Sequence, residues 1–251
     1  MSKIISLFNQ SGGVGKSTLT MNLGYHLGRE GHRVLLVDMD PQASLTAFMG
    51  LEPADLSETV YQSLLADAAL PVHNNIHGVD LVPANIDLSG AELELVLADM
   101  RDIRLKQALQ PITSSYDFVL IDCPPSLGLL SYISLVASTH VMVPIQTQYK
   151  ALKGTELLLK TVKRVRARAN PDLSIAGIVP TMHDSRTVQD QMSLEAIYSQ
   201  LAQVAPVFSP IPRSVAFADA SQEHLPLALY SAKHPAVAML QKIAEGMEQI
   251  K

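Results

Sequence analysis

The sequence predicts an α/β fold with a doubly wound, mainly parallel sheet and helices on both of its faces. Short apolar runs alternate with helix-length amphipathic stretches along the whole chain, as in repeated strand–helix–strand units. These apolar runs are nearly continuous, which indicates strands buried on both faces and therefore a parallel sheet. No repeat, low-complexity tract or Gly/Ser-rich linker divides the 251 residues, so we expect a single domain over residues 1–251.

The expected strands are six short apolar runs. They are Ile4–Phe8, Val34–Val37, Val79–Val82, Phe118–Ile121, His140–Pro144 and Ile175–Val179. Between them, apolar residues recur at three- and four-residue intervals and predict helices that include Ser17–Arg29 and Leu152–Ala167. The pattern is weakest over Leu51–Gly78, where prolines and an Asn-Asn pair interrupt the helical spacing.

The C-terminal stretch carries one apolar stripe at helical spacing. Its members are Val237, Leu240, Ile243, Ala244, Met247 and Ile250. Such a helix can pack on a core or lie on a membrane, and the nearby Lys242 and Lys251 are balanced by Glu245 and Glu248. Because no basic face is left for anionic lipid, we expect the helix to pack on the core.

Composition and charge exclude several classes of protein. Hydrophobic residues make up 47% of the chain and charged residues 17%, which is enough to form a core and excludes global disorder. The single cysteine, Cys123, excludes a disulfide framework and a self-contained Cys-ligated metal or iron–sulfur site. The N-terminus lacks the layout of a secretory signal, and no apolar run approaches the ~18 residues of a membrane span. We therefore expect a cytoplasmic protein with no membrane partner.

The first expected strand runs directly into a glycine-rich loop at which a helical pattern begins. Three glycines allow successive backbone N–H groups to point at an anion, and the helix N-terminus adds its partial positive charge. In such a loop the lysine lies along the β- and γ-phosphates, and the hydroxyl of the next residue binds Mg²⁺. The sequence thus predicts a phosphate site formed by Gly12, Gly13, Val14, Gly15, Lys16, Ser17 and Thr18, with Mg²⁺ as a cofactor.

Three aspartates stand at the ends of expected strands. Asp38 and Asp40 follow the second strand, and Asp122 follows the fourth. The carboxyl ends of parallel strands meet at one edge of a sheet, where the P-loop also lies. Because Mg²⁺ prefers oxygen ligands, we expect Asp122 to hold the ion through a water molecule.

Several further segments make the chain resemble the deviant Walker ATPases of the ParA/MinD group. Gln10 stands where the general P-loop has its first glycine, and the loop instead resembles the family pattern KGGxGK[ST]. The matching segments are Val37–Gln42 (second acidic motif), Ile121–Gly128 (Walker B) and, for the ParA branch in particular, Thr181–Thr187 and Ile211–Ser214, with Ser89–Leu95 also similar. The resemblance follows the whole chain in order.

This resemblance implies how the site works. The nucleotide is ATP, the enzyme is a slow ATPase stimulated by a partner, and the catalytic residues include Lys16 and Asp40, with Asp40 orienting the attacking water. Asp38 assists either at the metal, as a ligand beside Ser17, or in the geometry of the loop that follows. Adenine is expected near Thr181–Met182, Pro212 and Arg213. Guanine-specific P-loop proteins usually carry an Asn-Lys-x-Asp segment, and this sequence has none.

Position 11 departs from the family pattern. Relatives normally have a lysine there that crosses a sandwich dimer to the partner's nucleotide, whereas this chain has Ser11. Loss of a cation from a phosphoryl-transfer site lowers catalysis, because the stabilisation is largely electrostatic. Either hydrolysis is weak or another cation substitutes, and we expect Lys150 to be catalytic in this way, with Lys153 as the alternative. A serine at this position makes the chain resemble the carboxysome-distribution (McdA-type) ATPases of cyanobacteria, and this resemblance implies a carboxysome cargo.

The net charge of −5 is unevenly distributed. Lys150–Arg168 holds seven basic residues and one acidic residue, a net charge of +6, so the rest of the chain carries −11. The alternatives are a solvated helix face and a surface for the phosphate backbone of DNA, and we expect the latter, with sequence-independent, salt-sensitive binding. The expected contacts are Lys160, Lys163, Arg164, Arg166 and Arg168. Arg186 joins them because it matches a family position implicated in DNA contact, whereas Ala216 replaces an arginine of many relatives.

The leading hypothesis is a positioning ATPase. ATP closes a homodimer, the dimer binds nucleoid DNA nonspecifically, and a cargo adaptor triggers hydrolysis. Three alternatives stay open: a plasmid or chromosome partition ATPase, a weakly hydrolysing ATP switch that binds DNA, and a membrane-associated division regulator, which the terminal helix disfavours.

Overall fold

One sheet of seven strands forms the centre of the computed structural model, which describes residues 2–250 but not the side chains of residues 149–153. The strands are β1 (Lys3–Leu7), β2 (Val34–Asp38), β3 (His73–Ile76), β4 (Val79–Val82), β5 (Phe118–Asp122), β6 (His140–Gln146) and β7 (Ser174–Thr181). Their order is β3-β4-β2-β5-β1-β6-β7, and every pairing except β3 with β4 is parallel. The predicted doubly wound, mainly parallel α/β fold is therefore confirmed.

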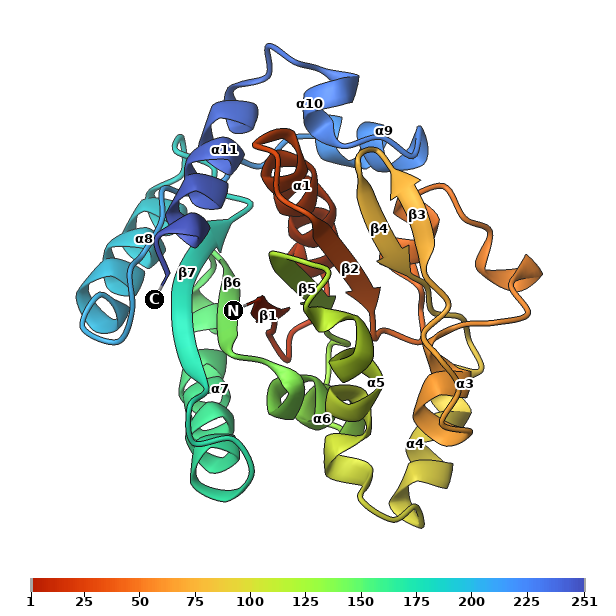
Figure 1. The fold of residues 1–251 in the computed structure, drawn as a ribbon. Helices are drawn as coiled ribbons and strands as arrows, with labels where there is room; N and C mark the ends of the chain where they lie inside the picture. The colour runs from red at the N-terminus through yellow and green to blue at the C-terminus, as the bar shows by residue number, and fades with distance from the viewer. Residues whose placement is uncertain (1, 251) are drawn as a thin grey trace.

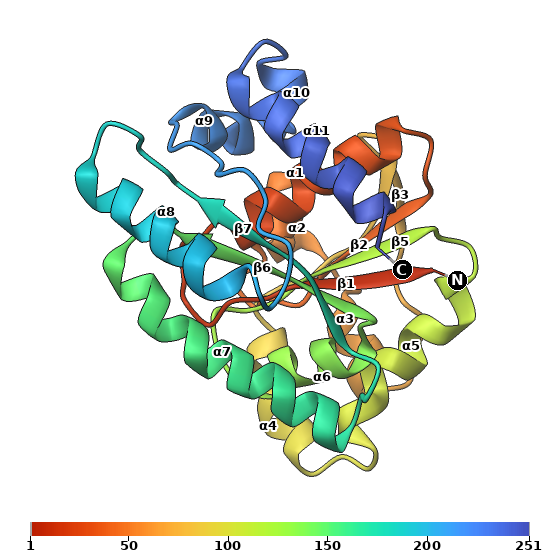
Figure 2. The same cartoon turned by 90° about the vertical axis from the view of Figure 1, so that its left-hand side faces the viewer.

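Helices cover both faces of this sheet, as Figures 1 and 2 show. They are α1 (Lys16–Arg29), α2 (Ser44–Phe48), α3 (Val60–Leu65), α4 (Leu88–Val96), α5 (Arg104–Thr113), α6 (Leu129–Ala137), α7 (Tyr149–Arg168), α8 (Val188–Leu201), α9 (Ala216–Gln222), α10 (Leu227–Tyr230) and α11 (Pro235–Glu248), with 3-10 turns at Pro53–Asp55 and Arg101–Ile103. In Figure 2 the strands run across the view, with α9–α11 above them and α4–α7 below.

The core consists of two apolar clusters, one on each face of the sheet. The cluster beneath α4–α7 includes Val119 and Ile121 of β5, and the opposite cluster includes Leu120 of the same strand. Alternate residues of one strand thus serve both clusters, which is why the strands read as continuous apolar runs. Within residues 2–250, no helix is both long and apolar enough to cross a bilayer.

Helix α11 packs on the core, as its stripe predicts. Leu240, Ile243, Ala244 and Met247 are buried in the cluster that α11 shares with α1, and Val237 and Ile250 are partly buried against it. Its apolar face is therefore occupied by the protein itself.

The antiparallel edge strand β3 was not expected. Its sequence, His73-Asn74-Asn75-Ile76, is mostly polar and exposed, so it lacks the apolar run that marks the other strands. It is joined to β4 by the two-residue turn His77-Gly78, and both of these residues have positive φ (53° and 84°). Two positive φ values are typical of a hairpin turn, so the local signal lies in the turn rather than in the strand.

Buried His26 on α1 makes stability depend on pH. The residue is 2% exposed, and burial, with a smaller contribution from Arg29, lowers its pKa from 6.5 to about 4. Between these values the unfolded chain binds a proton that the native protein does not, so stability falls as the pH drops. We expect urea unfolding to show that the wild type loses about 2 kcal/mol more than His26→Leu between pH 7 and pH 4.5. Equal losses in the two proteins would contradict this role of His26.

Candidate functional site

The loop between β1 and α1 adopts an anion-binding conformation. Gly13 and Gly15 have φ of +70° and +89°, in the left-handed region that only glycine enters without strain. Helix α1 begins directly after Gly15, and no described side chain caps its first turn. Its N-terminal backbone N–H groups are thus available for an anionic ligand, which the helix dipole also favours.

Lys16 is the buried cation of the loop. It is 6% exposed, and its Nζ donates a hydrogen bond to the carbonyl oxygen of Ser11 at 3.2 Å. Burial lowers the pKa of the ammonium, and the negative charges of Asp122 and Asp40 act against this shift. The side chain therefore folds back over the loop, where phosphate groups would lie.

Asp122 ends the central strand β5 beside Lys16 and is fully buried. Neither of its carboxylate oxygens has a hydrogen-bond partner of acceptable geometry within residues 2–250. Burial, followed by the charge of Asp38, raises its pKa well above the usual value, and Ser17 and Lys16 oppose the increase. Two unpartnered oxygens near a serine hydroxyl and a phosphate loop fit a hydrated Mg²⁺ ion, because the ion and its waters would satisfy them.

Asp38 holds the following loop in place. Its Oδ1 accepts a hydrogen bond from the Asp40 backbone at 3.0 Å, and its Oδ2 accepts bonds from both the backbone and the hydroxyl of Thr46 at 2.9 and 2.7 Å. Burial raises its pKa to about 6. Because both oxygens are engaged by the protein, this geometry favours the loop-organising role over direct metal ligation.

Asp40 lies at the entrance to the phosphate loop. It is 7% exposed, and its Oδ1 accepts a hydrogen bond from the Gln42 backbone at 3.0 Å, whereas no group in the described part of the chain donates to its Oδ2. Burial raises its pKa, and Lys16 acts in the opposite direction. The carboxylate is thus oriented within the same cavity as the P-loop.

Two adjoining cavities form the site at the carboxyl edge of the sheet. The smaller, of about 330 Å³, is lined by Gly12, Gly13, Gly15, Lys16, Ser17, Thr18, Asp40, Gln42, Ser44, Phe48, Pro125 and Met182. The larger, of about 420 Å³, is lined by Gly15, Thr18, Leu19, Gln146, Gln148, Thr181, Met182, Ile211, Pro212, Arg213, Ser214 and Phe217. A chamber lined by the P-loop, Lys16 and Asp40 beside a more apolar one matches the phosphates and the base of a nucleotide.

The base cavity brings together chain segments that are distant in the sequence. Met182, Pro212 and Arg213 line it as expected, and the Thr181 hydroxyl donates to the carbonyl oxygen of Val14 at 2.9 Å, which ties β7 to the P-loop. Sequence reasoning missed other lining residues, among them Gln146, Gln148 and Phe217. The sequence could have indicated Gln146 and Gln148, because they stand at the carboxyl end of a parallel strand next to β1, where ligands bind in such sheets.

The predicted DNA-contacting residues of α7 are exposed. Lys160, Lys163, Arg164, Arg166 and Arg168 form no ion pair with any side chain that the structure describes. The side chains of Lys150 and Lys153 lie outside the described residues, so their place relative to Ser11 is not defined.

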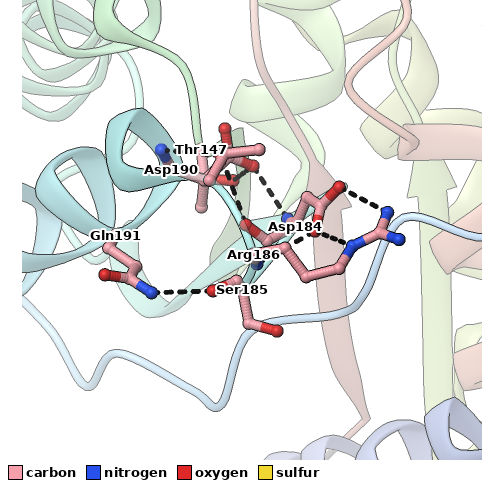
Figure 3. Close-up of polar contacts among 7 residues, drawn as sticks. Thr147, Asp184, Ser185, Arg186, Asp190 and Gln191 are labelled. Atoms are coloured by element: carbon pink, nitrogen blue, oxygen red, sulfur yellow. Dashed lines mark hydrogen bonds and ion pairs between the residues drawn. The ribbon is translucent and has the colours of Figure 1, made fainter.

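Arg186 is exposed but paired. Its guanidinium donates to both carboxylate oxygens of Asp184, at 2.9 and 2.8 Å, and lowers the pKa of that carboxyl below its usual range (Figure 3). Asp190 fixes the same loop, because its Oδ2 accepts bonds from the Asp184 backbone at 2.8 Å and from the Thr147 hydroxyl at 3.0 Å. The loop that carries Arg186 is thus tied to the end of β6.

The fold and the site together define a P-loop nucleotide-binding protein of the Walker type. Residues 2–175 match a protein family described as an AAA domain. The Bacillus subtilis sporulation initiation inhibitor protein Soj is 42% identical to this chain over 233 residues, 92% of each protein. Chromosome partitioning protein ParA of Myxococcus xanthus is 40% identical over 237 residues, 92% of this chain and 82% of its own length. The chain belongs to the ParA/MinD-type Walker ATPases, which confirms the resemblance seen in its motifs.

Solved structures agree with this assignment. Cobyrinic acid a,c-diamide synthase from Mycobacterium smegmatis with bound ADP and magnesium has a TM-score of 0.86 at 35% identity and covers 98% of this chain and 93% of its own. Apo McdA from Cyanothece has a TM-score of 0.87 at 24% identity, covering 99% and 100%, which shows a shared fold. The expected need for ATP and Mg²⁺ agrees with the nucleotide and magnesium in the first structure.

Proposed function

We propose that this chain is a partition ATPase that hydrolyses ATP with Mg²⁺ to position a cargo. The observation that carries the proposal is the pair of adjoining base and phosphate cavities, the second of which is lined by Lys16 and Asp40. Bound Mg²⁺ would be held by the Ser17 hydroxyl and by Asp122 through water, and it would neutralise charge on the phosphates. Lys16 binds the phosphate oxygens, and Asp40 orients the attacking water, while Asp38 keeps the loop after β2 in position.

The proposal includes a nucleotide-driven cycle of association. ATP closes a sandwich homodimer, the dimer binds double-stranded DNA regardless of sequence, and an adaptor on the cargo stimulates an otherwise slow hydrolysis. Lys150 supplies the cation that Ser11 lacks. In this cycle the protein works in the cytoplasm on the nucleoid and releases DNA when the dimer opens.

Two cargoes are supported by different observations. The relatives at 40–42% identity include proteins named for chromosome partitioning, which favours DNA as the cargo. Ser11, together with Lys150 as the substitute cation, favours carboxysomes. Deletion of the gene distinguishes the two cargoes. We expect anucleate cells if the cargo is DNA and clustered carboxysomes if the cargo is the carboxysome. Normal distribution of both would overturn the positioning role.

DNA binding tests this cycle. We expect ATP-dependent retardation of DNA of any sequence, and replacement of Lys160, Lys163 and Arg164 together by alanine should lower affinity at least tenfold. Each lost phosphate contact should also lower the dependence of log affinity on log salt by about 0.9. Lys242→Ala, on the exposed side of α11, is the matched control and should bind normally. Equal DNA binding without nucleotide, or none with ATP, would refute the proposal.

A further inference from the structure

An uncovered apolar surface follows helix α4. Its members are Ile86, Leu93, Val96, Leu97 and Met100, which are 54–89% exposed. They are five of the thirteen large apolar side chains exposed in the described part of the chain, although they come from only 15 residues. Their spacing places them along one side of α4 and of the turn after it, and we call this surface the α4 stripe.

Helix α4 is apolar on two sides. Leu88, Ala91 and Leu95 are fully buried in the core cluster, so they account for the packing of the helix. Figures 1 and 2 both place α4 at the lower margin of the molecule, away from α9–α11. A contiguous apolar surface that the fold does not need is typical of an interaction site.

The charges around the stripe are acidic. Asp87 and Glu94 are exposed and seven residues apart, so they lie on the same side of the stripe. Arg101 lies at the stripe, where it donates to the Val96 carbonyl, but its charge is offset by the pairing with Asp102. Arg104 is turned to the Leu64 and Leu65 carbonyls. An acidic rim favours a partner with a basic one.

A second copy of this chain fits the stripe less well. In a two-fold dimer the same surface supplies both sides, so the interface would gather Asp87 and Glu94 of both copies and concentrate acidic charge there. A partner helix with an apolar face and flanking lysines or arginines has no such conflict and matches a known way of binding a helix at an apolar surface.

The inner side of α4 contacts the segment that follows Asp122. The Glu92 Oε1 accepts a hydrogen bond from the Leu130 backbone at 3.3 Å, at the first turn of α6. It also lies against Gly128, where an added Cβ would clash with it. The connection from Asp122 to α6 is thus held partly by a residue of the helix that carries the stripe.

We propose that the α4 stripe is the docking surface for a basic amphipathic helix of the cargo adaptor, and that Glu92 transmits docking to the Asp122–Gly128 segment. The proposal rests on the function proposed above and names the partner's chemistry. Glu92 is a positioning residue in this scheme, because it contacts the segment after the metal-binding aspartate rather than the nucleotide.

A synthetic peptide tests the docking step. The probe is a labelled helical peptide of about 18 residues with a leucine face and a lysine face, and a peptide of the same composition in scrambled order is its control. Fluorescence anisotropy should show at least tenfold weaker probe binding to Leu93→Ser/Leu97→Ser than to the wild type. The matched variant Val188→Ser/Met192→Ser, which alters exposed apolar residues of α8, should bind like the wild type. Equal binding by all three proteins, or equal binding of the scrambled peptide, would overturn the proposal.

A charge variant covers the case in which the double serine variant is misfolded. Asp87→Lys/Glu94→Lys keeps the apolar stripe and should weaken probe binding at least fivefold. Unchanged binding by this variant contradicts the acidic rim. Sedimentation tests whether the stripe is instead a contact between copies. If the wild type does not bind the probe and Leu93→Ser/Leu97→Ser loses the self-association of the wild type, the stripe joins two copies and the adaptor proposal is wrong.

Turnover tests the role of Glu92. Glu92→Gln should bind the probe as the wild type does, but the probe should stimulate its ATP hydrolysis at least threefold less. A merely structural role would lower binding and stimulation together. Leu93→Ser/Leu97→Ser should retard DNA in the presence of ATP as the wild type does. If the wild type itself does not retard DNA, the proposed function is wrong. If the wild type retards DNA but does not bind the probe, only the docking site is wrong.

Discussion

Replacing Lys16 with methionine should lower ATP turnover by about two to three orders of magnitude. The ammonium is the buried cation of the phosphate loop, and loss of one group that stabilises developing charge typically has an effect of this size. Methionine keeps the length and the apolar part of the side chain, so the free energy of unfolding should change by less than about 1 kcal/mol. Phosphate release at saturating ATP and urea unfolding measure the two quantities.

Another lysine provides the control for this experiment. Lys106 is exposed on α5, outside both cavities, so Lys106→Met should keep wild-type turnover. A Lys16→Met protein that hydrolyses ATP within a factor of three of the wild type would remove the P-loop from the mechanism. The same assay tests the substitute for Ser11: Lys150→Ala should lower turnover and Lys153→Ala should not, and wild-type turnover in Lys150→Ala would reject Lys150.

Replacing Asp40 with alanine should separate ATP binding from hydrolysis. The carboxylate lies in the phosphate cavity with one oxygen held by the Gln42 backbone, a geometry suited to orienting water. Loss of such a group typically lowers the rate by about 10² to 10⁴. Because the phosphate loop stays intact, the variant should still bind ATP and should remain on DNA after excess ATP is removed.

The persistence of these DNA complexes is the informative measurement. Wild-type complexes should decay as ATP is hydrolysed, and complexes of the exposed control variant Asp55→Ala should decay at the same rate. If Asp40→Ala complexes also decay at that rate, hydrolysis does not control release. If the variant no longer binds ATP, Asp40 belongs to the ground-state binding site and a different group orients the water.

The site residues differ in how well local sequence could predict them. The P-loop was predictable because its glycine spacing, lysine and helix start are consecutive in the chain. The position of Asp122 at a strand end was predictable from the sequence. The lack of hydrogen-bond partners for its two oxygens among the described residues was not, since it results from packing of β5 between β1 and β2. The pairing of Arg186 with Asp184 was overlooked because charge counting treats every arginine as free.

The stripe on α4 illustrates a different limit. Leu88, Ala91 and Leu95 face the core whereas Leu93, Val96 and Leu97 face outward, although all six are apolar. Only the position of α4 on the molecule separates buried residues from exposed ones.

By itself, the sequence determined the fold class, the phosphate loop and the family of this protein, because apolar runs and contiguous motifs reflect local geometry. The tertiary structure alone decided four features: the antiparallel position of β3, the joining of P-loop and base-cavity residues from β6, β7 and the 211–217 segment, the engagement of Asp38 with Thr46, and the exposure of the α4 stripe. The joined cavity depends on contacts between residues far apart in the chain, which exist only once the sheet has assembled. The β3–β4 hairpin and the contact between Asp38 and Thr46 are short in sequence, but neither an apolar run nor a contiguous motif marks them.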